Sequence, residues 1–240
     1  MVIRPQIRFN HLGIDQGLLF IATALLPVYT FNSGGIQPAH AFFAFFILLT
    51  SIRYGITTKP WAFLVLCLFV YAFFRESAYI LVGGSLDYLI NAVYLGYNFF
   101  LVSAVYKYVL HNGMATIISG LIFAVIIVLV TISTQGITLT VGAEGAVRSV
   151  GTFNNPNQLG YFSVCLLSLT YLSYLTSSIS YRVAITGFCI SIALSIISLS
   201  KAAIVANFVL LFIVLVPRNV SFSHSIIFGS ALILCGYILF

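Results

Sequence analysis

Residues 114–134 read MATIISGLIFAVIIVLVTIST and contain no charged side chain. A helix of this length rises about 30 Å, which matches the hydrocarbon thickness of a lipid bilayer. Lipid offers no hydrogen-bond partners, so the backbone N–H and C=O groups of such a segment must pair with one another, as they do in an α-helix. The stretch therefore predicts a transmembrane helix.

The rest of the chain repeats this pattern. Of its 240 residues, 61% are apolar and 6% are charged, whereas a soluble domain carries about 25% charged residues. We therefore predict an all-α, polytopic transmembrane helical bundle of about nine spans, in which residues 1–240 form a single transmembrane domain. The expected spans lie at 17–33, 39–52, 61–74, 86–106, 114–134, 159–177, 183–199, 202–216 and 226–240, and residues 75–85 are a candidate interfacial helix.

Charge and cysteine patterns exclude two other classes. The net charge of +6 comes from ten Lys and Arg residues that are scattered singly, so no basic face forms and nucleic acid is not an expected partner. The cysteines have no CxxC spacing and no neighbouring His or carboxylate, so no metal site is expected. They fit small apolar positions within the spans, at Cys67, Cys165, Cys189 and Cys235.

The positions of Lys and Arg predict the orientation. Cytoplasmic loops of membrane proteins carry an excess of these residues. With the N-terminus in the cytoplasm, seven of the ten fall inside and three outside, which favours this orientation. The inner residues are Arg4, Arg8, Arg53, Lys59, Lys107, Arg182 and Arg218, and the outer ones are Arg75, Arg148 and Lys201.

The longest polar loop, 135–158, falls on the outer side in this orientation. It contains the sequence RSVGTFNNPN at 148–157, directly before an expected span. Asn155 is a favourable helix N-cap, and Pro156 suits the first helical position. The outer loop therefore predicts a helix whose N-terminus faces the outer surface.

A helix N-terminus favours phosphate, because its unpaired N–H groups carry partial positive charge. Arg148 adds a full charge with two parallel donors, and Gly151 lets the backbone approach a ligand closely. Lys201, in the sequence SLSK at 198–201, lies on the same side before a second inward-running span. We therefore predict that two cations and two helix N-termini form one anion site.

The loop motif RxxGxFxNPN at 148–157 resembles the signature of the O-antigen ligase and polymerase superfamily, in which this loop also precedes a membrane span. The motif SxSK at 198–201 resembles the Ser-Arg stretch at the start of a following span in that family, with Lys in place of Arg. Together the motifs cover residues 148–201, and the first 147 residues match only as a series of spans.

The resemblance implies a bacterial inner-membrane glycosyltransferase that acts on the outer face and needs no cofactor. Its substrate would be a glycan on undecaprenyl diphosphate, transferred to lipid A core by a ligase or to a growing glycan by a polymerase. Arg148 and Lys201 would be the catalytic residues, because they would hold the diphosphate and offset its charge as it leaves. The implied substrate-binding residues are Gly151, Phe153, Asn155, Asn157 and Ser200.

The sequence departs from the family at two points. Lys201 keeps the charge of the family's Arg but lacks its planar fork. Members of the family usually continue into a large outer loop and further spans, so the resemblance implies that 1–240 is an N-terminal portion. No general base for the acceptor hydroxyl is identified within it.

Two other functions stay open from the residues. A transporter or flippase for a lipid-linked or anionic solute predicts charged groups near the bilayer midplane or broken helices in symmetric positions. A non-catalytic assembly protein predicts that Arg148 is dispensable. Taken singly, Arg148 and Lys201 also fit interfacial anchors, and the Asn-Pro-Asn sequence fits a plain turn with a cap.

Overall fold

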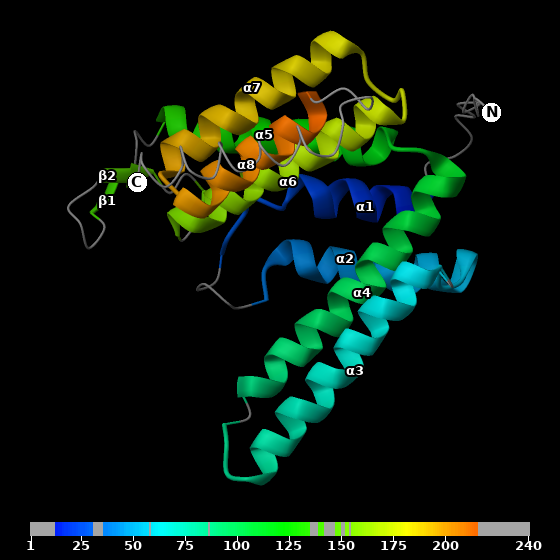
Figure 1. The fold of residues 1–240 in the computed structure, drawn as a ribbon. Coiled ribbons are helices and arrows are strands. Elements are labelled where there is room, and N and C mark those ends of the chain that lie inside the picture. The colour runs from blue at the N-terminus through cyan, green and yellow to red at the C-terminus, as the bar shows by residue number, and fades with distance from the viewer. Residues whose placement is uncertain are drawn as a thin grey trace, which may run out of the picture. The chain divides into compact units, whose positions relative to one another are not determined.

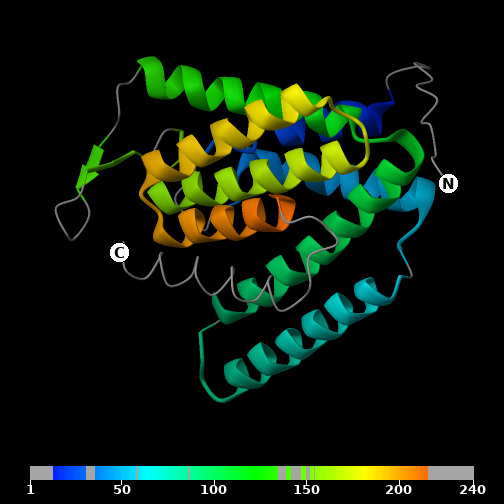
Figure 2. The ribbon, with the colours of Figure 1, turned by 45° about the horizontal axis from the view of Figure 1, so that its top comes forward.

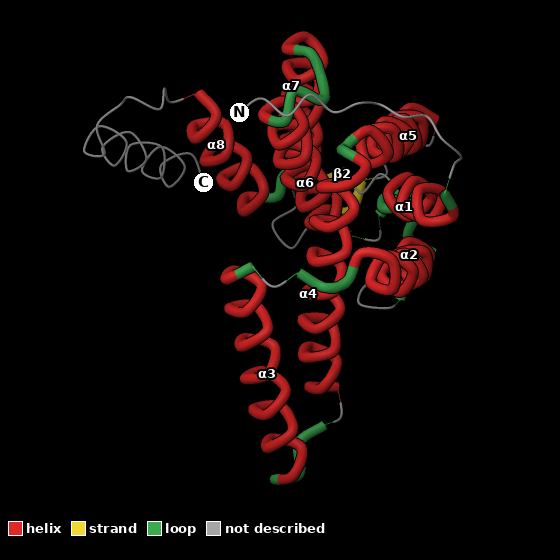
Figure 3. The backbone as a smooth tube through the Cα atoms, turned by 90° about the vertical axis from the view of Figure 1, so that its right-hand side faces the viewer, coloured by secondary structure: helices red, strands yellow, loops and turns green. Residues whose placement is uncertain are grey.

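The computed structural model describes residues 13–30, 36–57, 59–85, 87–134, 139–141, 147–149, 152–153 and 155–215. Nearly all of these residues are helical, as Figure 3 shows, which confirms the predicted all-α class. The elements are α1 (Ile14–Ala24), α2 (Pro38–Tyr54), α3 (Pro60–Leu81), α4 (Asp87–Asn112), α5 (Ala115–Thr134), β1 (Leu139–Val141), β2 (Val147–Ser149), α6 (Pro156–Leu175), α7 (Tyr181–Ser198) and α8 (Lys201–Leu215).

The chain is a membrane protein, because several of its helices are long and apolar enough to cross a bilayer. Four such segments lie in the described part of the chain, and α1, α2 and α8 are apolar but shorter. The count of about nine spans stays a prediction, and the expected run 226–240 falls outside the described residues. The four long segments are Ala62–Leu81, Ala92–Asn112, Ala115–Thr134 and Tyr181–Ser198.

Three expected boundaries were wrong. The span 86–106 does not end before Lys107, since α4 continues to Asn112. Among the described residues of the run 17–33, the helix ends at Ala24, because Pro27 lacks a backbone donor and its ring opposes continuation of a helix. The span 61–74 does not end before Arg75, since α3 continues to Leu81. Arg75 pairs with Glu76 on the same helix, and this pairing offsets the cost of carrying charges within an apolar helix.

The described residues form two compact units. The first comprises those within Met1–Ala22 and His40–Thr116, and the second those within Thr23–Ala39 and Ile117–Phe240. Residues 148–201, which contain both predicted motifs, belong entirely to the second unit. Each unit is held together by its own contacts.

In the first unit, α3 packs along α4 (Figure 1). Gly96 permits this approach, because a Cβ built there would lie 2.7 Å from the ring of Phe69. A salt bridge of 3.2 Å between Asp15 and Arg53 joins α1 to α2.

In the second unit, α6, α7 and α8 pack together, and α5 lies along the same unit (Figure 2). α6 and α7 approach closely at Gly187, where a Cβ would lie 2.8 Å from the side chain of Thr170. Between α5 and α6 lies a pair of short strands that the sequence did not predict. In it, β1 pairs antiparallel with β2, and Thr140 lies opposite Arg148.

Candidate functional site

The start of α6 is held by the predicted cap. Asn155 has an extended backbone, and its side-chain oxygen accepts a hydrogen bond of 2.8 Å from the backbone N–H of Asn157. Pro156 occupies the first helical position, where its missing N–H costs nothing. The cap therefore confirms the predicted helix start, and the side chain of Asn157 remains exposed beside it.

Phe153, shortly before α6, packs against other aromatic rings of the second unit. Its ring is 5% exposed and lies 5.2 Å from the ring of Tyr29 and 5.6 Å from the ring of Phe162. Aromatic rings at such distances pack favourably. The structure thus gives Phe153 a packing role, while its contact with substrate stays a prediction.

A tight reversal joins α7 to α8. The hydroxyl of Ser198 donates to the carbonyl of Ser195 at 2.8 Å and accepts from the backbone N–H of Ser200 at 3.2 Å. Leu199 between them has a φ of 48°, in the left-handed region that a leucine seldom adopts. This turn makes Ser200 the residue that precedes α8 and Lys201 the first residue of the helix.

The two motifs meet where α6 and α8 begin. Gly160, in the second turn of α6, faces the start of α8, and a Cβ built there would lie 2.7 Å from the Cβ of Ser200. The same atom would lie 2.8 Å from the Cβ of Ala203. The second turn of α6 therefore packs closely against the first turn of α8. The sequence analysis missed Gly160, although a glycine one turn after the cap is a signal of close packing.

The third part of the predicted site, Arg148, lies in the middle of β2. β2 contacts α7, and Figures 1 and 2 show the pair of strands beyond the C-terminal end of α7. That end leads into the turn before Lys201, so β2 is on the same side of the unit as the start of α8. Gly151 lies outside the described residues.

A buried cluster of polar side chains links α6, α7 and α8 near the contact at Gly160. The hydroxyl of Ser163 donates to the carbonyl of Gly160 at 2.6 Å and accepts from the side-chain amide of Asn207 at 3.0 Å. The hydroxyl of Ser191 donates to the carbonyl of Ser163 at 2.5 Å. All three polar side chains are buried, and they come from α6, α7 and α8. The cluster therefore sets the spacing of the helices that form the site.

These contacts produce an electropositive end of the helical unit. Asn157 and Lys201, in the first turns of α6 and α8, are exposed, whereas Ser200 is buried. Two helix N-termini and a lysine together attract an anion through partial and full positive charge. Within the described ranges, no group of His, Cys, Asp and Glu gathers in a way that would hold a metal ion.

Comparisons with protein-family models, with curated proteins and with solved structures give no match. The chemistry of the site therefore follows from its own residues.

Proposed function

We propose that the protein is a membrane glycosyltransferase that transfers or polymerises glycan from an undecaprenyl-diphosphate carrier. The reaction would take place on the outer face of a bacterial inner membrane, with the N-terminus of the chain in the cytoplasm. The observation that carries the proposal is the close approach of α6 to the start of α8 at Gly160 and Ser200. Ser200 belongs to the second motif, and Gly160 lies in the helix that follows directly from the first motif.

A lipid-linked diphosphate matches this end of the unit in charge and position. Its phosphates would lie at the helix N-termini and beside Lys201, with Arg148 approaching from β2. Its isoprenoid tail would stay in the bilayer next to the apolar helices. A carrier that is both anionic and membrane-bound therefore matches the positive charge of the site and its position next to apolar helices.

The chemistry of transfer explains why fixed cations would be needed. The acceptor hydroxyl would give its proton to a general base and form a new bond to the anomeric carbon of the donor sugar, while the bond from that carbon to the diphosphate oxygen breaks. Negative charge then increases on the departing diphosphate. Arg148 and Lys201 would stabilise this charge without reorganisation, which is an effective form of electrostatic catalysis.

The remaining motif residues would shape the site. Asn155 holds the start of α6, and Phe153 holds the loop on the helices. Gly151 would allow the backbone to approach the phosphates, and Asn157 and Ser200 lie at the two helix starts. The acceptor would be lipid A core for a ligase or a growing glycan for a polymerase.

The test is complementation of a deletion strain, read out as the length of surface polysaccharide chains on a gel. Wild type should restore long chains, whereas Arg148→Ala and Lys201→Ala should not. Lys107→Ala, which removes a cation from the first unit, is the matched control and should behave as wild type. Immunoblots of membranes establish equal expression.

Other outcomes contradict the proposal. If Arg148→Ala and Lys201→Ala complement as well as Lys107→Ala, these cations have no catalytic role. If deletion leaves the surface glycan unchanged although the gene is expressed, transport of an anionic or lipid-linked solute becomes the better hypothesis.

A further inference from the structure

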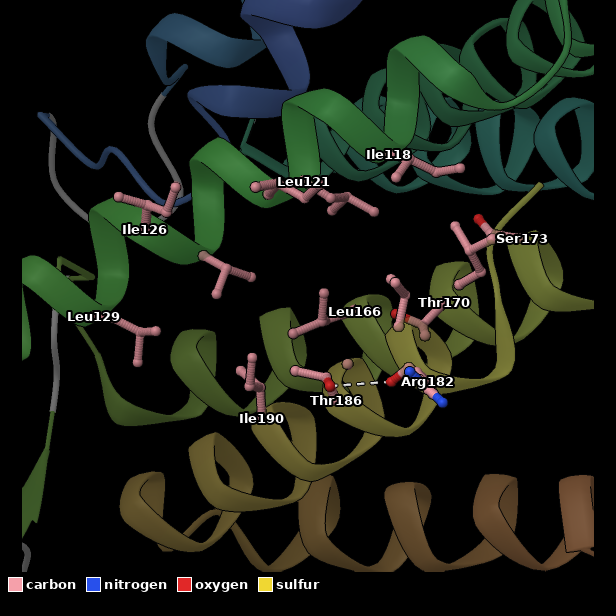
Figure 4. A pocket seen from close by; sticks show the side chains of 15 residues that line it. Ile118, Leu121, Ile126, Leu129, Leu166, Thr170, Ser173, Arg182, Thr186 and Ile190 are labelled. Carbon is pink, nitrogen blue, oxygen red and sulfur yellow. Dashed lines mark hydrogen bonds between the residues drawn. The ribbon is translucent and has the colours of Figure 1, made fainter.

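The second unit contains an apolar groove between α5 and the pair formed by α6 and α7. Its volume is about 450 Å³, and fifteen residues of the three helices and the α6–α7 connection line it (Figure 4). One wall is formed by aliphatic side chains of α5, among them Ile122 and Ile126. The opposite wall includes Leu166 of α6 and Ile190 of α7.

The few hydroxyl groups in the groove do not make it polar. Ser173 donates to the carbonyl of Leu169 at 2.7 Å, and Thr186 donates to the carbonyl of Arg182 at 3.0 Å. Both donors are thus engaged by the backbone of their own helix, which is common for Ser and Thr in helices. The third hydroxyl residue of the lining, Thr170, is buried and packs against Gly187. The walls therefore suit a hydrocarbon chain better than water or a polar ligand.

One end of the groove is different, because it carries a charge. Arg182 is the charged residue among the fifteen that line it, and its side chain is exposed. Within the described part of the chain, neither of the two ion pairs involves Arg182. Figure 4 shows it at the same end as Ser173, where α6 finishes and α7 begins. An apolar groove with a cation at its end matches a molecule with an apolar tail and an anionic head.

We propose that this groove binds a membrane phospholipid with an anionic headgroup, with one acyl chain between α5 and the α6–α7 pair and the phosphate beside Arg182. Ligand sites of this volume are ordinary in size, and their lining is typically apolar with a small number of polar groups. Anionic lipids are attracted to basic residues at the cytoplasmic surface. The predicted orientation places Arg182 at that surface.

The lipid site is distinct from the diphosphate site. From Pro156 to Ser173, α6 rises about 25 Å at about 1.5 Å per residue. The two sites therefore lie near opposite ends of α6. Lipid binding in the groove does not depend on glycan transfer, and each can be tested without the other.

The experiment is native mass spectrometry of the purified protein, titrated with phosphatidylglycerol or with phosphatidylcholine that carries the same acyl chains. Wild type should retain phosphatidylglycerol preferentially. Arg182→Gln should reduce its retention about fivefold, the effect expected of one basic residue at an anionic surface. Lys107→Gln removes a cation from the first unit and is the matched control, so it should leave retention unchanged.

The position of the acyl chain is tested by filling the groove. Ile122→Trp should reduce the retention of both lipids, and Ile126→Phe provides a second substitution with less bulk if the first prevents folding. Circular dichroism and gel filtration identify folded variants. Equal retention by Arg182→Gln and Lys107→Gln would overturn the headgroup assignment. Unchanged retention in a folded groove-filling variant would overturn the placement of the tail.

Discussion

Replacing Gly160 with alanine tests the contact on which the candidate site depends. The added Cβ would lie 2.7 Å from the Cβ of Ser200 and 2.8 Å from the Cβ of Ala203. Carbon atoms normally approach to about 3.5–4.0 Å, so each distance is about 1 Å too short. Since Cβ atoms do not move when a side chain rotates, relief requires α8 to shift as a whole.

The expected change in the free energy of unfolding combines two opposing effects. Overpacking of this kind destabilises a protein by about 1–3 kcal/mol, whereas glycine to alanine within a helix favours the helix by about 1 kcal/mol. The net result for Gly160→Ala should be a loss of stability of up to about 2 kcal/mol. A shift of about 1 Å at Lys201 should also lower transfer activity by about 100-fold, because catalysis depends on position.

The assay is thermal unfolding in detergent together with complementation of surface polysaccharide. Gly17→Ala in α1 is the matched control, because no described atom lies within 4 Å of a Cβ built at Gly17. This control should be stabilised by about 1 kcal/mol and fully active. If Gly160→Ala unfolds and complements like Gly17→Ala, α6 and α8 do not approach closely at Gly160.

Three further predictions concern the supports of the site. Asn155→Ala should lower the free energy of unfolding by about 1 kcal/mol, because it removes the cap on Asn157, while Asn155→Ser should retain most of this stability. Equal unfolding temperatures of the two variants would contradict the cap. Phe153→Ala should cost about 3–5 kcal/mol, measured by detergent unfolding, and the loop should become sensitive to protease; an unchanged digest would argue against anchoring. Ser163→Ala should cost about 0.6–1.7 kcal/mol by breaking the bond from Asn207, and a double-mutant cycle with Asn207→Ala should show coupling of that size rather than additivity.

The helices and the cap were predictable because they depend on local properties. In lipid, the backbone groups of a run such as 114–134 can form hydrogen bonds only with one another, so its composition alone implies a helix. Asn155 and Pro156 act on neighbouring backbone groups, and the cap therefore appears where the sequence predicts it. The prediction failed near Arg75, because the adjacent Glu76 provides a pairing partner that lets the helix continue.

The class of protein, the positions of most helices and the residue types that suit a phosphate could be read from local sequence. The approach of Gly160 to Ser200, the packing of Phe153 between two rings and the apolar groove beside α5 became visible only in the folded chain. The physical reason is that helix formation depends on residues within one or two turns. Contact between helices depends instead on the shapes of surfaces that are distant in the chain, where the absence of a single Cβ sets how closely two backbones approach.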